Sequence, residues 1–206
     1  MVKTPNYWQK ACKELSKKDK TLAKIIKAHK KLVLSSKRKP FLTLIKAILG
    51  QQVSVAAADA IYARLVEKLA RKNISYQNIL KLKDAEMRDC GISRQKVLYI
   101  KNIAEHFAKN KITNAYFDKK SPEEVREELI AIKGIGNWTM EMFEIFYLNA
   151  PDIFPLGDIG LVRALERLYN LETKEEMLEY SKCWQPYRTV VTWFLWAWKD
   201  AELVEY

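Results

Sequence analysis

The chain has 206 residues, of which 49% are hydrophobic, so it is long enough to bury a sizeable core and is globular rather than disordered. No segment approaches eighteen uninterrupted apolar residues and the N-terminal segment has no apolar signal core, so we expect no membrane span and an intracellular, cytoplasmic protein. Residues 1–40 contain thirteen Lys or Arg and two acidic residues, Glu14 and Asp19. The net charge of this segment, +11, therefore equals the net charge of the whole chain. Such a segment attracts a polyanion, although two solvated amphipathic helices would carry the same lysines.

The apolar pattern is helical along most of the chain, and strand-like alternation is almost absent, which predicts an all-α fold. Two capping boxes support this pattern, one starting at Ser121 and one pairing Thr173 with Glu176. The predicted helices lie near residues 6–16, 20–31, 41–49, 53–70, 75–81, 84–90, 93–109, 122–131, 137–148, 159–169, 173–181 and 186–200.

The cysteines and histidines do not predict a metal site. Cys12, Cys90 and Cys183 are far apart without a C-x-x-C spacing, so we expect them to be reduced, buried residues. His29 and His106 lie in lysine-rich helical patterns and are expected to be ordinary surface or edge residues. We therefore expect no redox cofactor and no catalytic metal.

Residues 129–139, LIAIKGIGNWT, predict two helices joined by a tight turn. Gly134 and Gly136 bend the backbone, and Ile135 between them can pack between the helices. The N–H groups that follow would point outward at the start of a helix, where a phosphate binds well. A helix–helix turn without a ligand would also fit a lone G-x-G. The longer pattern from the apolar run to Thr139 is less common and favours a DNA phosphate.

Asp158 follows Gly157 and precedes the apolar segment 159–165, where an Asp is a good N-cap. Most residues of this kind only cap the helix. Capping does not exclude catalysis, because backbone N–H groups keep the carboxylate ionised and fix its direction. A phosphate site followed by this carboxylate suggests chemistry on a nucleic acid.

Together the hairpin 129–139, the Gly157-Asp158 step, residues 48–54 and the C-terminal WQPYR at 184–188 resemble the helix-hairpin-helix (HhH-GPD) DNA glycosylase superfamily. The chain is most similar to the 3-methyladenine DNA glycosylase II family, from about residue 41 to residue 200. This resemblance implies a two-lobed helical fold with a cleft between the lobes. The central lobe would be 41–150, with the hairpin 129–148, and the second lobe would be 1–40 plus 151–206. The damaged nucleotide is rotated out of bent duplex DNA into the cleft.

The resemblance also implies the site residues. Asp158 corresponds to the catalytic aspartate, and hairpin carbonyls at 133–136 would hold a structural monovalent cation, Na⁺ or K⁺. Gln52 would wedge into the gap left by the flipped base, although a polar cap on a buried loop explains it equally well. The expected DNA-binding residues are Gln51, Gln52, Lys133, Gly134, Ile135, Gly136 and Thr139.

Trp138 stands where superfamily members that also cut the backbone carry a nucleophilic lysine. An indole cannot attack C1′, so the lyase reaction lacks its nucleophile. Trp138 can stack on an electron-poor alkylated base, or it can simply pack the second helix of the hairpin. Met142 and Trp196 are the other expected pocket residues, although Met142 replaces a tyrosine of some relatives and Trp196 also suits a buried final helix. Tyr187 and Arg188 are weaker candidates.

We therefore predict a monofunctional glycosylase that excises alkylated purines, of the 3-methyladenine type, from damaged duplex DNA in base excision repair. A purine alkylated at N3 or N7 leaves as a cation without a general acid, so the single carboxylate of Asp158 suffices. We expect a monomer. One alternative is a glycosylase for uracil or a deaminated purine. Another is a non-catalytic helix-hairpin-helix DNA-binding module in which Asp158 only caps a helix, and a third is a basic all-α scaffold protein.

Overall fold

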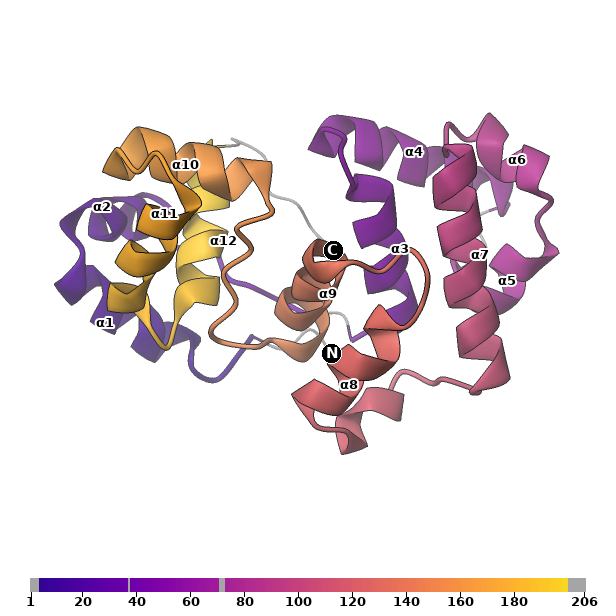
Figure 1. The fold of residues 1–206 in the computed structure, drawn as a ribbon, viewed down its shortest axis with the longest axis horizontal. Coiled ribbons are helices and arrows are strands. Elements are labelled where there is room, and N and C mark those ends of the chain that lie inside the picture. The colour runs from indigo at the N-terminus through magenta and orange to yellow at the C-terminus, as the bar shows by residue number, and fades with distance from the viewer. Residues whose placement is uncertain (1–3, 37, 71–72, 200–206) are drawn as a thin grey trace. The chain divides into compact units, whose positions relative to one another are not determined.

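The computed structural model describes residues 4–36, 38–70 and 73–199, and within these ranges it contains helices and no β-strand (Figure 1). The chain divides into two compact units. Of the described residues, one unit contains 38–70 and 73–143, and the other combines 4–36 with 144–199. Residues 144–150, expected in the central lobe, therefore belong with the terminal segments. No helix of the described residues is long and apolar enough to cross a membrane.

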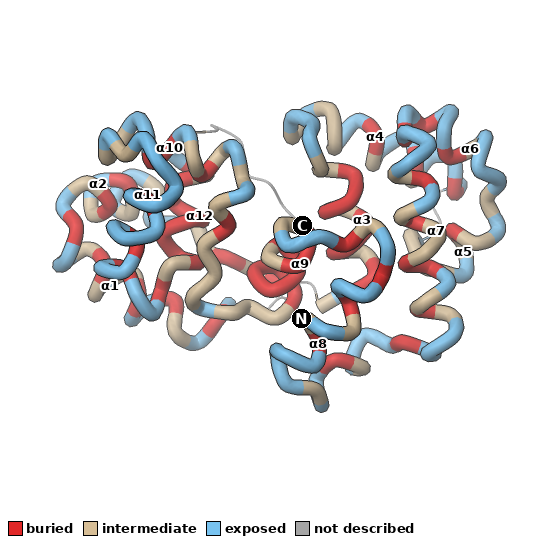
Figure 2. Tube along the Cα trace, viewed as in Figure 1, coloured by how far each residue is buried: buried red, intermediate tan, exposed pale blue. Residues whose placement is uncertain are grey.

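The unit of residues 38–143 is built around α3 (Pro40–Gly50), which packs against α4, α7 and α9. Apolar residues occupy all faces of α3, as is typical of a buried helix. Leu44, Ile45 and Ile48 are completely buried, and most of α3 is drawn as buried in Figure 2. The other helices of this unit are α4 (Val55–Lys68), α5 (Tyr76–Lys81), α6 (Asp84–Asp89), α7 (Arg94–Lys109), the 3₁₀ helix η1 (Tyr116–Lys119), α8 (Pro122–Ile130) and α9 (Asn137–Phe143).

The other unit is built around α12 (Arg188–Lys199), which contacts α1, α2 and α10. Val190, Val191 and Leu195 on α12 are completely buried. Its remaining elements are α1 (Trp8–Lys18), α2 (Lys20–Ala28), the π-helix η2 (Glu144–Leu148), α10 (Ile159–Tyr169), α11 (Lys174–Ser181) and the 3₁₀ helix η3 (Lys182–Trp184).

Most predicted helices are present with ends shifted by a residue or a few. The predicted helix 137–148 is wrong in its second half, where α9 ends at Phe143 and a π-helix follows. The pattern of apolar residues indicates which residues are buried. It does not distinguish the i→i+4 hydrogen bonds of an α-helix from the i→i+5 hydrogen bonds of a π-helix. The cysteines are free, but Cys183 is exposed and Cys12 only half-buried, contrary to the expectation that all would be buried.

Candidate active site

The hairpin from α8 to α9 needs a glycine at 134 for two reasons. Gly134 has φ +113°, in the left-handed region that side chains rarely adopt. A Cβ at this position would also lie 2.3 Å from Cγ of Tyr99, so the backbone packs directly on that ring. Gly134 is therefore fixed by the fold.

Gly136 differs, because no atom lies within 4 Å of the position its Cβ would occupy. Its carbonyl accepts a hydrogen bond of 3.0 Å from the N–H of Met140, so the first turn of α9 begins here. The first N–H groups of a helix have no partner within the helix. Gly136 and Asn137 are exposed, so this turn is accessible to an anion.

Gln51 fastens the hairpin to the end of α3. Its Nε2 donates to Oγ1 of Thr139 at 2.8 Å and to the carbonyl of Gly134 at 3.3 Å. Thr139 is buried, as is Ile135 between the glycines. The side chains of Gln51, Ile135 and Thr139, expected to bind DNA, thus stabilise the hairpin in this structure.

Gln52 is exposed and adopts φ +55° in the turn between α3 and α4. A residue other than glycine in this conformation is uncommon and marks a turn under constraint. Lys96 supports the same turn, since its Nζ donates to the carbonyls of Leu49 and Gln51 at 2.8 and 2.7 Å. Burial lowers the pKa of Lys96.

One face of α7 supports the hairpin, which the sequence analysis did not anticipate. Tyr99, Asn102 and His106 repeat at i, i+3 and i+7 and so share this face. Tyr99 packs under Gly134, and Nδ2 of Asn102 donates to the carbonyl of Lys133 at 3.0 Å. His106 contacts Glu128 on α8 at 2.9 Å.

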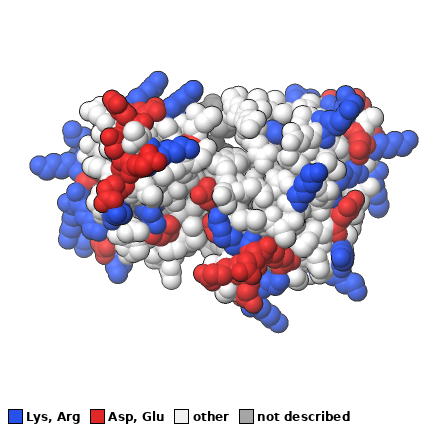
Figure 3. All heavy atoms as spheres, in the orientation of Figure 1, with Lys and Arg blue, Asp and Glu red and all other residues white. Residues whose placement is uncertain are grey.

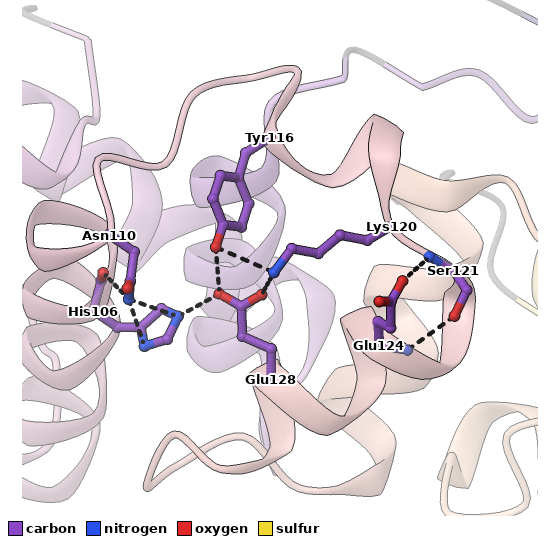
Figure 4. Close-up of polar contacts among 7 residues, drawn as sticks. All are labelled: His106, Asn110, Tyr116, Lys120, Ser121, Glu124 and Glu128. Carbon is purple, nitrogen blue, oxygen red and sulfur yellow. Dashed lines mark hydrogen bonds and ion pairs between the residues drawn. The ribbon is translucent and has the colours of Figure 1, made fainter.

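Glu128 is the centre of the polar cluster drawn in Figure 4. Its carboxylate contacts Nε2 of His106, Nζ of Lys120 and, at 3.3 Å, the hydroxyl of Tyr116. Burial raises the pKa of Glu128, but the bonds from Lys120 and His106 outweigh it and the pKa is lowered. His106 was expected to be an ordinary surface or edge residue, and the structure shows it half-buried. Its i+7 spacing from Tyr99 was the sequence signal for its contact with Glu128.

The expected pocket residues on α9 differ in accessibility. Trp138 is half-buried. Met142, one turn later, is buried with 1% of its surface exposed. Met142 is a core residue in this structure, and its contact with a substrate stays a prediction.

Asp158 caps α10 and is fixed from two directions. Its Oδ1 accepts hydrogen bonds of 2.8 Å from the N–H of Leu161 and from Nε1 of Trp196. Trp196, on α12, is itself held by stacking on Phe146, with ring centroids 6.0 Å apart and planes 10° apart. The carboxylate therefore has a defined orientation and remains half-buried.

The absence of a side chain at Gly160 lets the carboxylate of Asp158 and the ring of Trp196 lie close to the backbone of α10. A Cβ on Gly160 would lie 2.9 Å from Oδ1 of Asp158, 3.4 Å from Cδ1 of Trp196 and 3.6 Å from Nζ of Lys199. Any side chain here would displace the carboxylate or its neighbours. Glycine also lowers helix propensity, so a glycine in the first turn of α10 was a signal that could have been read from the sequence.

The two weaker candidates have structural contacts. Arg188 forms a two-pronged ion pair with Asp152, in which Nε and a terminal nitrogen donate to Oδ1 and Oδ2 at 2.8 Å each. The ring of Tyr187 stacks on that of Tyr7 at 6.2 Å. Both residues hold the start of α12 in place.

Two surface hollows lie on the unit of residues 38–143. One, of about 560 Å³, is lined by residues between 85 and 94. Neither of the two is lined by Asp158 or Trp138. The other, of about 520 Å³, includes Asn102, His106 and Lys133 and adjoins the hairpin. Among the described residues, no cluster of His, Cys, Asp and Glu could hold a metal ion.

The structure thus groups the expected residues within each unit. Gln51, Gly134 and Thr139 meet at the hairpin, and Asp158 meets Trp196 at the start of α10.

Comparison with known proteins identifies the family. Residues 45–188 match the family model of the HhH-GPD superfamily base excision DNA repair proteins. DNA-3-methyladenine glycosylase 1 of Schizosaccharomyces pombe is 35% identical over 194 residues, which cover 91% of this chain and 83% of that protein.

Two solved structures agree with this match. The structure of the S. pombe 3-methyladenine DNA glycosylase in complex with abasic DNA has a TM-score of 0.79 at 32% identity, covering 91% of this chain and 95% of that one. A DNA-3-methyladenine glycosidase from Bacillus halodurans has a TM-score of 0.71 at 31% identity, covering 96% and 91%. The chain belongs to the HhH-GPD superfamily of base excision DNA repair proteins.

Proposed function

We propose that this protein is a monofunctional DNA glycosylase that excises alkylated purines, of the 3-methyladenine type, from duplex DNA. The observation that carries the proposal is the carboxylate of Asp158, whose direction is fixed by hydrogen bonds from the N–H of Leu161 and from Nε1 of Trp196. The names of the S. pombe and B. halodurans relatives support the substrate class.

In the proposed reaction the bond between C1′ and the base nitrogen breaks, and the cationic purine leaves with the bonding electrons as a neutral base. The carboxylate of Asp158 stabilises the positive charge that develops on the sugar. Water then forms the new bond to C1′ and transfers a proton to Asp158, which leaves an abasic site. Trp138 supplies no amine for a Schiff base, and in this proposal its indole stacks on the electron-poor base.

The hairpin supplies the phosphate contact in this proposal. The exposed first turn of α9 at Gly136 and Asn137 binds a backbone phosphate, with Lys133 nearby as an exposed cation. The constrained, exposed Gln52 fills the gap left by the flipped base. The protein acts as a monomer inside the cell, where its DNA substrate is.

A monovalent cation at the hairpin is compatible with the residues present. The carbonyls of Lys133 and Gly134 accept side-chain amides from Asn102 and Gln51, and each carbonyl oxygen has a second lone pair. These two carbonyls would hold Na⁺ or K⁺ and add positive charge near the phosphate. Exchanging Na⁺ or K⁺ for tetramethylammonium at constant ionic strength should then weaken DNA binding.

The decisive experiment measures free base released from methylated duplex DNA by the wild type and by Asp158→Asn, with strand cutting scored before and after alkali. Asn also caps helices well, so the variant should fold and bind DNA. We expect a fall in rate of at least about 100-fold, with strands intact until alkali.

Equal turnover by both proteins would reject the role of Asp158. Strand cutting without alkali would reject the monofunctional reaction. Absence of release from alkylated DNA, with release from uracil- or hypoxanthine-containing DNA, would assign another lesion. DNA binding without release from any of these substrates would favour a non-catalytic DNA-binding module.

A further inference from the structure

Lysines form a regular outer surface on α1 and α2. Lys10, Lys13 and Lys17 repeat at i, i+3 and i+7 on α1, and Lys20, Lys24 and Lys27 repeat at i, i+4 and i+7 on α2. All six side chains belong to exposed residues. We call these six residues the lysine face; each helix contributes one stripe to it.

The fold directs these lysines outward. Trp8, Ala11 and Leu15 of α1 are buried, as are Leu22 and Ile25 of α2. These apolar stripes pack within the unit, where α1 and α2 contact each other and α12. The lysines occupy the remaining faces of both helices and are not needed for the core.

One of the two acidic residues of this segment, Asp19, is buried and therefore contributes little negative charge to this surface. Asp19, between the two helices, is only 8% exposed, because its Oδ1 accepts from the N–H of Leu22 and its Oδ2 accepts from Tyr169 and Trp184. Glu14 remains and lies 3.9 Å from Lys10. Lys and Arg side chains accordingly gather over the part of this unit where α1 and α2 lie, at the left of the view (Figure 1, Figure 3).

We propose that the lysine face binds phosphates of duplex DNA outside the segment held by the hairpin, as a second, sequence-independent contact surface. The choice of DNA as the polyanion rests on the proposed function. Flexible ammonium groups spaced about one helical turn apart suit a phosphate backbone without reading its sequence. This surface would hold the enzyme on undamaged DNA while it searches for a lesion.

The test is the salt dependence of binding to an undamaged 30-base-pair duplex. The triple variant Lys20→Gln, Lys24→Gln, Lys27→Gln removes the positive charges of the α2 stripe. Glutamine also favours the helix and has an unbranched side chain, so α2 should be kept. Each lost phosphate contact lowers the slope of log Kd against log salt by about 0.9, so the triple variant should lose about 2.7. The rate of base release at saturating DNA should not change.

A matched control makes the same change in net charge elsewhere. Lys81, Lys83 and Lys119 are exposed residues of the other unit, and their triple Gln variant should keep the wild-type slope. An equal decrease of the salt-dependence slope in both triple variants would attribute the effect to net charge and overturn the proposal. An unchanged slope in the α2 variant would also overturn it. Loss of binding to phosphatidylserine vesicles with an unchanged DNA slope would assign the lysines to a membrane instead.

The lysine face and the proposed function fail in different ways. If the wild type releases no base but the α2 variant alone loses salt dependence, the glycosylase proposal is wrong and the DNA-binding surface stands. If base release depends on Asp158 but the salt-dependence slope does not depend on these lysines, the glycosylase proposal stands and the proposed DNA-binding surface is wrong.

Discussion

Nε1 of Trp196 donates a 2.8 Å hydrogen bond to Oδ1 of Asp158, so an aromatic residue of the last helix orients the carboxylate at the start of α10. Trp196 was expected to line a substrate pocket. In the structure its polar edge is committed to Asp158, and its ring stacks on Phe146. Its first role is to position the group that we propose to be catalytic.

The variant Trp196→Phe tests this positioning. It keeps an aromatic ring but removes the hydrogen bond to a charged oxygen, which is worth about 1.5–3 kcal/mol. If that energy is lost in the transition state, base release at saturating DNA should slow about 10- to 100-fold. The matched control is Trp193→Phe, because Nε1 of the buried Trp193 has no hydrogen-bond partner among the residues that the structure describes. Equal rates in the two variants would contradict the role of Trp196.

The two hairpin glycines should behave differently when changed to alanine. Gly134→Ala forces a side chain into a left-handed conformation and against Tyr99, so we expect a loss of about 1–3 kcal/mol in the free energy of unfolding and weaker DNA binding. Gly136→Ala meets no neighbouring atom, so it should unfold like the wild type and lose only DNA affinity. Denaturant unfolding and DNA titration of both variants check this. Unchanged affinity in Gly136→Ala would argue against a phosphate at this turn.

His106 should support the hairpin through Glu128. His106→Leu leaves part of a half-buried carboxylate without its donor, so we expect a loss of about 1–3 kcal/mol in the free energy of unfolding. His106→Gln can still donate and should restore most of it. Asn110→Ala is the control, since Asn110 contacts His106 but not Glu128. If both His106 variants unfold like the wild type, the contact has no structural importance.

Stability should fall in acid partly through Asp152. Burial raises the pKa of Asp152, but the hydrogen bonds and charge of Arg188 lower it further, so the pKa in the folded state lies below the usual value of about 3.9. The pair therefore stabilises the fold above that value, and this contribution is lost as the pH falls through the folded-state pKa. Asp152→Asn should be less stable than the wild type at pH 7, with the difference shrinking toward pH 2. A constant difference across urea titrations at these pH values would contradict this.

The helical periodicity, the caps and the glycines predicted much of this protein. Ser121, Thr173 and Asp158 cap helices as expected, because a cap is satisfied by residues within one turn of it. The pattern around Gly134 likewise indicated a hairpin, and the family comparison agrees with the function class inferred from it. Local physics decided these features, so the sequence contained them.

Only the tertiary structure decided which side chains meet. The bonds from Gln51 to Thr139, from Trp196 to Asp158 and from Tyr169 to Asp19 join residues far apart in the chain. Periodicity indicates which residues are buried but not which neighbours they find. The sequence alone therefore determined the helices, the hairpin and the candidate carboxylate. Packing decided which polar groups orient that carboxylate, which residues support the hairpin, and which charge is withdrawn from the lysine face.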